Sequence, residues 1–180
     1  MTVIGEVLRM KYLPVIILVF LIFLFAVRCE HGLSPPNKKN TNPNNLTGIS
    51  GVIIYKNYQN WPSPDSLFDL RLVAFPHFPP QNPYYEIFTK IAKVYPPIDT
   101  SAHLQFNVLY EEYVMELPPD TFEYILVAQQ YEDSLTSWLS VGQYDTYSDS
   151  LPTPVIVIQD SLLENININV DFKNLPIQPF

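Results

Sequence analysis

Cys29 is the only cysteine of the chain, and its position is the most informative chemical feature of the sequence. It follows residues 12–27, which read YLPVIILVFLIFLFAV and carry no charge, while Arg9 and Lys11 stand before them. A positive start followed by an apolar block is typical of an export signal. A helix that crosses a bilayer needs about 20 apolar residues, so the shorter block favours a signal peptide. The question that this position raises is whether the thiol of Cys29 receives a lipid.

The end of this block resembles a bacterial lipoprotein signal, in which the cysteine becomes the mature N-terminus and carries the lipid. Ala26 and Val27 fit that pattern, whereas Arg28 stands where a small residue is usual. The resemblance implies lipid attachment at Cys29 and a membrane-anchored domain in the bacterial cell envelope, outside the cytoplasm. Two alternatives stay open, namely an uncleaved N-terminal membrane anchor over residues 1–29 and simple secretion.

No other group of reactive residues has the spacing of a catalytic or metal site. His31, His77 and His103 are far apart in the sequence, and a zinc site needs three or four converging ligands. No serine lies on a glycine-flanked elbow and no glycine-rich phosphate loop is present. Glu111 and Glu112 are adjacent, so on a strand their carboxylates would point to opposite faces. We therefore expect a protein that is not an enzyme and that binds no cofactor or metal.

Four aromatic residues in or beside loops are candidates for ligand binding: Trp61, Tyr84, Tyr85 and Trp138. Exposed rings at such positions could stack on sugars or on a partner protein. The alternative is that these rings cap the ends of the β-structure and cover its core.

The charge of the chain limits its partners. Lys and Arg total 10 against 18 Asp and Glu, which gives a formal net charge of −8. An acidic surface repels phosphate backbones, so we expect no nucleic-acid partner. Membrane attachment would then depend on the N-terminus, and the remaining partners are an envelope protein or a glycan.

The composition divides the chain into three parts: 1–29, 30–46 and 47–180. Residues 30–46, EHGLSPPNKKNTNPNNL, are rich in Asn, Pro and Lys, and such a segment buries too little apolar area to fold. We predict a flexible, disordered tether there, between an N-terminal hydrophobic helix and a folded domain that begins at residue 47.

Period-two alternation predicts that the domain is all-β. In residues 164–172, ENININVDF, apolar and polar side chains alternate strictly, which puts one face of a strand on a core and the other in water. Similar segments predict about seven strands in an antiparallel β-sandwich: 48–57, 68–76, 102–110, 121–131, 137–145, 153–160 and 164–172. Residues 84–95 could form a short helix or an irregular crossover.

The order of these motifs resembles the transthyretin-like β-sandwich of carboxypeptidase regulatory-like domains. The opening TGISGVIIYKN, the strand DLRLVAF and the segment LPPDTFEYILVAQQ, residues 117–130, carry the resemblance. It implies a non-catalytic spacer or binding platform, so we expect an envelope-anchored interaction or adaptor module. The alternative is a carbohydrate-binding domain that uses the loop aromatics.

Overall fold

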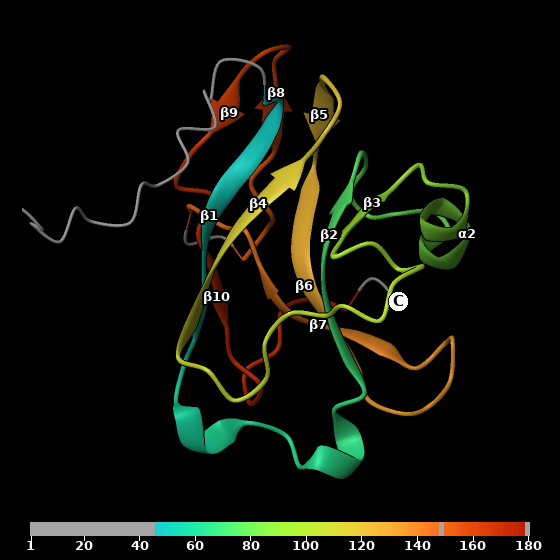
Figure 1. The fold of residues 1–180 in the computed structure, drawn as a ribbon, viewed down its shortest axis with the longest axis vertical. Coiled ribbons are helices and arrows are strands. Elements are labelled where there is room, and N and C mark those ends of the chain that lie inside the picture. Colours follow the sequence, from blue (N-terminus) through green and yellow to red (C-terminus); the bar gives the residue numbers. More distant parts are fainter. Residues whose placement is uncertain (1–45, 148–149, 179–180) are drawn as a thin grey trace, which may run out of the picture. The chain divides into compact units, whose positions relative to one another are not determined.

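The computed structural model describes residues 46–147 and 150–178, and within them it confirms a β-rich fold (Figure 1). These residues form ten strands, one short α-helix and two short 3-10 helices. In chain order they are β1 (Gly48–Tyr55), η2 (Tyr58–Asn60), η3 (Pro64–Ser66), β2 (Asp69–Phe75), α2 (Pro83–Phe88), β3 (Lys93–Tyr95), β4 (Tyr110–Glu116), β5 (Asp120–Phe122), β6 (Tyr124–Gln130), β7 (Trp138–Gln143), β8 (Val155–Val157), β9 (Leu162–Leu163) and β10 (Ile168–Val170).

One mixed sheet contains eight of the strands. Its order is β3-β2-β6-β7-β10-β1-β4, with β9 paired to β1 beside this path, and β5 and β8 form a separate two-stranded sheet. β1 pairs in parallel with β10 and with β9, whereas its pairing with β4 is antiparallel. The expectation of purely antiparallel pairing is therefore wrong. Side-chain alternation marks a strand but not the direction of its neighbour, and β1 and β10 come from opposite ends of the domain.

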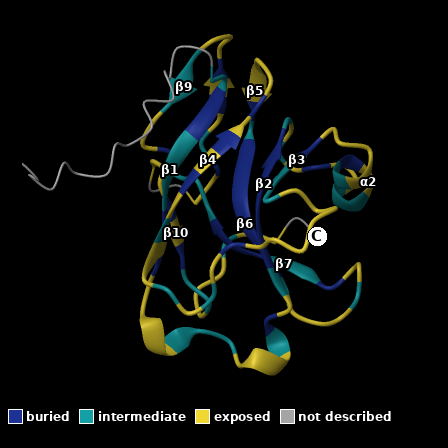
Figure 2. Ribbon diagram, viewed as in Figure 1, coloured by how far each residue is buried: buried dark blue, intermediate teal, exposed yellow. Residues whose placement is uncertain are grey.

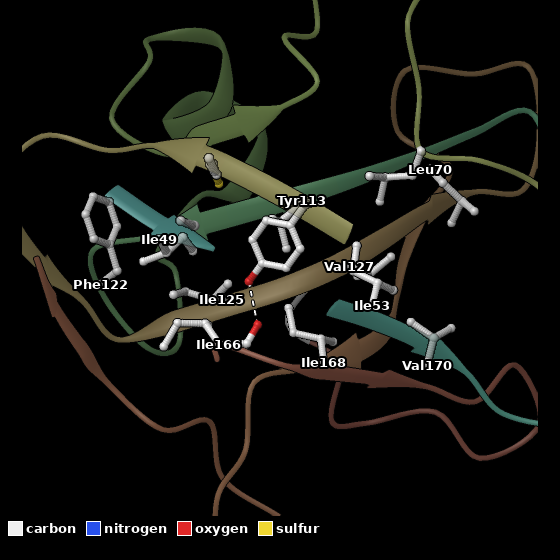
Figure 3. Packing of buried hydrophobic residues seen from close by; sticks show 14 of the residues in the cluster. Ile49, Ile53, Leu70, Tyr113, Phe122, Ile125, Val127, Ile166, Ile168 and Val170 are labelled. Atoms are coloured by element: carbon white, nitrogen blue, oxygen red, sulfur yellow. Dashed lines mark hydrogen bonds between the residues drawn. The ribbon is translucent and has the colours of Figure 1, made fainter. Parts of the chain in front are cut away.

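The main core lies on the inner face of this curled sheet and takes side chains from β1, β2, β4, β6 and β10. Figure 3 shows Ile49, Ile53, Ile125, Val127 and Ile168 directed toward a common interior. β2 and β6 are buried along nearly their whole length (Figure 2), because a second apolar cluster covers their other face. Burial on both faces explains why these two strands read as continuous apolar runs rather than as alternating ones.

Residues 102–110 do not form the predicted strand. Leu104 is buried and Phe106 and Val108 are half-buried, so the alternation reflects packing of an extended segment against the core. A single backbone bond, from the N–H of Leu104 to the carbonyl of Leu70, ties this segment to β2. Asn107 takes a left-handed conformation with φ 57° and interrupts the extension. The strand begins only at Tyr110, as β4.

The ambiguous residues 84–95 contain a short helix followed by a strand. Asn82 caps α2, since its side chain accepts a hydrogen bond from the N–H of Tyr85 at 3.1 Å, and Pro83 fits the first helical position. The buried carboxylate of Glu86 accepts bonds from the N–H groups of Gln81 and Asn82 at 3.0 and 3.3 Å. These contacts fix α2 over the second apolar cluster.

Gly51 is required where the C-terminal segment docks on β1. A Cβ atom at Gly51 would lie 2.2 Å from the carbonyl oxygen of Ile166. The hydroxyl of Tyr113, the residue opposite Gly51 on β4, donates a hydrogen bond to the same oxygen at 2.6 Å (Figure 3). The side-chain oxygen of Asn167 accepts the N–H of Val52 at 2.9 Å. Glycine and these two side chains therefore hold the last segment against the first strand.

The anchor predicted over residues 1–29, with its hydrophobic helix and Cys29, lies outside the described residues, as do residues 30–45 of the predicted tether. Within 46–147 and 150–178, no helix has the length and apolar character needed to span a membrane.

Candidate functional site

A groove lies between α2 and the face of β2, β3, β6 and β7 that is turned away from the main core. It consists of a cavity of about 170 Å³ and an adjoining hollow of about 290 Å³, which share Ile87, Phe88, Val94 and Ile98. We call this surface the α2 groove. Its position follows from the period of the strands, because Asp69, Arg71 and Val73 of β2 point to the side opposite Leu70 and Leu72.

The lining of the α2 groove is mainly apolar. Val73, Ala128 and Trp138 come from the sheet, and Ile87 comes from α2. Three large apolar side chains at its margin are exposed: Leu135 by 70%, Phe88 by 57% and Ile98 by 39%. A concave apolar surface with exposed margins has the character of a binding site. A cavity of about 170 Å³ is smaller than typical small-molecule sites of roughly 300–1,000 Å³.

Arg71 is the buried cation that shapes the groove, and only 4% of it is exposed. Its Nε donates to both carboxylate oxygens of Asp69 at 2.8 Å. The guanidinium also donates to the carbonyl oxygens of Pro96, Pro97 and Thr100 at 3.0, 3.0 and 3.2 Å. The side chain therefore holds residues 96–100 against β2 and so positions Ile98 at the groove. Because its donors are committed to the protein, its role is structural.

Tyr84 connects α2 to the loop between β6 and β7. Its hydroxyl donates a hydrogen bond to the carbonyl oxygen of Thr136 at 2.6 Å. Burial, and secondarily the nearby Tyr131, raises the pKa of Tyr84 above its ordinary value, so it is neutral at physiological pH. This bond draws Leu135 and α2 toward each other on either side of the cavity.

The charges beside the groove balance. The hollow is lined by Lys90 and Lys93 and also by Asp99 and Glu116, while Asp69 and Arg71 form the ion pair of the cavity. The groove is thus locally neutral although the chain carries a net charge of −8. Local neutrality favours a neutral, apolar ligand over a strongly charged one.

The structure brings together two of the four aromatic residues predicted to stack on a ligand. Tyr84 and Trp138 both line the α2 groove. Trp61 instead packs against Tyr55 and Phe172, with ring centroids 4.6 and 4.8 Å apart, beside the main core. Tyr85 lies on α2 and is 59% exposed.

The other candidate chemical groups stay apart. His77 and His103 are exposed, and His103 stacks on Phe106 with ring centroids 4.2 Å apart. Glu111 pairs with Ile53 and Glu112 with Val52, so the two carboxylates face opposite sides of β4. Burial raises the pKa of Glu111, and the N–H of Gln105, which bonds the carboxylate at 2.7 Å, opposes that shift. In the described part of the chain, no three acidic, His or Cys side chains cluster as metal ligands.

Comparison with protein-family models, with curated proteins and with solved structures finds no match for this chain.

Sequence reasoning missed most of the groove because its apolar residues look like ordinary core. One signal was available: Arg71 stands in the middle of the strand DLRLVAF, where every following residue is apolar. A cation inside a buried strand must have an internal partner, and here that requirement leads to Asp69 and to residues 96–100. Leu135 and Ile98 carry no such signal, since they lie in loops.

Proposed function

We propose that this chain is a non-enzymatic interaction module that binds apolar side chains of a partner protein in the α2 groove. The observation that carries the proposal is a concave apolar surface whose margin exposes Leu135, Phe88 and Ile98. Burying such side chains on a partner would stabilise a complex by roughly 25 cal/mol per Å² of apolar area removed from water. The size of the cavity suits one or two side chains.

The carbohydrate-binding alternative requires polar groups that are free to bond sugar hydroxyls beside an aromatic ring. Trp138 and Tyr84 supply rings, but three polar groups that line the same cavity are already bonded within the protein. Arg71 and Asp69 bond each other, and the hydroxyl of Tyr84 is bonded to Thr136. The groove chemistry therefore favours a protein partner over a glycan.

We further propose that the curled sheet is a two-layer sandwich related to carboxypeptidase regulatory-like domains. The support is that β1, β4 and β10 contribute to the same core as β2 and β6, as two layers around one core would. The sequence motifs of residues 48–57 and 117–130 add to this likeness. The parallel β1–β10 pair would then be a departure from the antiparallel sandwich of that family.

Anchoring in the bacterial cell envelope through Cys29 is part of the same proposal. One acyl chain gives marginal membrane binding and two or three give durable attachment, at about 0.8 kcal/mol per buried CH₂. The intact mass of protein extracted from membranes is expected to match a chain that begins at Cys29 and carries acyl groups. A mature chain that begins elsewhere with an unmodified thiol would refute lipid attachment.

Binding in the α2 groove is tested with the full chain in lipid nanodiscs and the peptide Ser-Gly-Phe-Ser-Leu-Gly-Ser. Leu135→Asp puts a carboxylate at the apolar margin and is expected to weaken binding about tenfold, the effect of 1.4 kcal/mol. NMR titration measures the affinity.

The matched control is Leu109→Asp, because Leu109 is 60% exposed and lies outside the groove lining. It should leave the affinity unchanged, and a peptide with Ala in place of Phe and Leu should not bind. Equal weakening by both variants, or equal binding of the Ala peptide, would contradict groove binding. Binding of chitohexaose that is lost in Trp138→Ala would favour the carbohydrate alternative.

A further inference from the structure

β4 is an end strand of the main sheet, and only its β1 side is paired within the described residues. The N–H of Tyr55 bonds the carbonyl oxygen of Leu109, and the N–H of Leu117 bonds the carbonyl oxygen of Thr47. The odd-numbered residues of β4 therefore direct their backbone N–H and C=O groups toward β1. In an antiparallel ladder the residues between them direct their N–H and C=O groups the other way. Glu112 and Val114 therefore present backbone donors and acceptors along a free edge.

The side chains along this edge alternate in chemistry. Tyr110 is 65% exposed and Val114 is 46% exposed, and Glu112 and Glu116 between and beyond them are exposed as well. Neither glutamate forms an ion pair, since Asp69 and Arg71 form the only pair among the described residues. On the exposed face of β4, apolar side chains therefore alternate with glutamates that form no ion pair with another described residue.

There is room beside this edge, because the curled sheet leaves a seam between β4 and β3, its two end strands. A hollow of about 550 Å³ is lined by Tyr95 of β3 together with Glu112 and Val114 of β4. The smaller hollow of the α2 groove is lined by Lys93 and Val94 of β3 together with Glu116. β3 and β4 are not paired with each other.

We propose that the β4 edge binds an extended segment of a partner protein as an added strand, and that every second residue of this segment, on the face shared with Tyr110 and Glu112, is basic and apolar in turn. Its backbone would pair with the outward groups of Glu112 and Val114. Its Lys or Arg side chains would lie opposite Glu112 and Glu116, and its apolar side chains opposite Tyr110 and Val114. This inference rests on the edge alone and does not depend on binding in the α2 groove.

Charge argues against the other occupants of the edge. A second copy of β4 would bring Glu111, Glu112 and Glu116 close to the same residues of the first, and like charges across strands are destabilising. Residues 30–45 of this chain contain Lys38 and Lys39 but are rich in Asn and Pro, and proline cannot donate to a ladder. A basic, apolar segment of another protein satisfies both requirements.

The test measures amide hydrogen exchange by NMR on the full chain in nanodiscs, with the peptide Lys-Thr-Val-Thr-Lys-Thr-Tyr as the probe, whose Lys, Val, Lys and Tyr share one face of a strand. In the free protein the N–H groups of Tyr113 and Met115 should exchange slowly because they bond β1, and those of Glu112 and Val114 should exchange fast. With the peptide, the amides of Glu112 and Val114 should become slow. Binding that leaves these two amides fast, or no binding, would overturn the proposal.

Two variants, each with a matched control, test whether the peptide binds at the β4 edge. Val114→Pro removes an outward N–H that takes no part in the β1 ladder, and it should weaken peptide binding at least about tenfold, whereas Val114→Ala should have little effect. Glu112→Lys should weaken binding roughly fivefold, and Asp65→Lys, an equal charge change at an exposed site in η3, should not.

The remaining outcomes also decide the question. Equal weakening by Glu112→Lys and Asp65→Lys would show nonspecific attraction and overturn the proposal. Slow exchange at Glu112 and Val114 that grows with protein concentration, without peptide, would overturn it in favour of self-association. Leu135→Asp should leave peptide binding at the edge unchanged, so failure of the groove proposal and failure of this one are distinguishable.

Discussion

Replacing Arg71 by methionine is expected to lower the free energy of unfolding by about 3–5 kcal/mol, the usual cost of removing one partner of a buried ion pair. The Asp69 carboxylate would lose the Nε–H that bonds both of its oxygens, and the carbonyls of Pro96, Pro97 and Thr100 would lose their donor. Urea unfolding measures the change. Because residues 96–100 would also be released, the variant should lose peptide binding in the α2 groove.

Arg71→Lys is the control for charge. It keeps the cation beside Asp69 but cannot reach two carboxylate oxygens and three carbonyls with one ammonium group. We expect a loss of stability between that of methionine and the wild type. A methionine variant as stable as the wild type would show that Arg71 does not organise this side of the sheet.

The second large effect is a loss of stability at alkaline pH. Burial raises the pKa of Tyr124 to about 12, although the bond from its hydroxyl to Ser140 lowers it slightly. Burial raises the pKa values of Tyr55 and Tyr113 still further, with smaller contributions from Glu111 and Tyr144 respectively. In the unfolded chain these hydroxyls ionise near 10.0. The folded state therefore keeps protons that the unfolded state has lost.

The contribution of these three hydroxyls to the free energy of unfolding should be constant below pH 10 and should fall as the pH rises from 10 toward 12. Each retained proton lowers the free energy of unfolding by about 1.4 kcal/mol per pH unit. Urea unfolding at several pH values gives the slope, and tyrosinate absorbance shows whether these hydroxyls ionise only on unfolding.

Tyr124→Phe tests the assignment of the alkaline slope. The hydroxyl of Tyr124 lies 3.3 Å from the buried hydroxyl of Ser140, so its removal should cost about 1–3 kcal/mol at neutral pH, whereas the alkaline slope should decrease by about one proton. If the stability of the unaltered protein stayed constant from pH 10 to 12, the buried tyrosines would not be the cause of an alkaline loss of stability.

Local alternation allowed most strands to be predicted. Ile166, Ile168 and Val170 are buried and the Asn residues between them are exposed, as the period predicts. The continuous apolar runs of β2 and β6 likewise became neighbouring interior strands of the sheet. These features depend on neighbouring residues only, so the sequence displays them directly.

What could not be predicted depends on distant contacts. The parallel pairing of β1 with β10 depends on how the chain returns after β7, and the period does not encode this path. Leu104 looks like a strand residue because it is buried, yet it bonds β2 only through its N–H.

The α2 groove was not predictable as a surface for the same reason. It requires α2, β3 and the β6–β7 loop to meet, through Arg71 and Tyr84. Two of the four aromatic candidates line it because α2 and the start of β7 converge there, and Trp61 packs beside the core instead.

The fluorescence of Trp138 tests the central claim of an apolar groove for a protein partner most directly. Trp61→Phe leaves Trp138 as the only tryptophan, and phenylalanine can keep the ring contacts of Trp61, whose indole N–H has no partner among the described residues. Ser-Gly-Phe-Ser-Leu-Gly-Ser should shift the emission of Trp138 to shorter wavelength, and chitohexaose should leave it unchanged. Emission that responds to the sugar and not to the peptide would contradict a groove built for a protein partner.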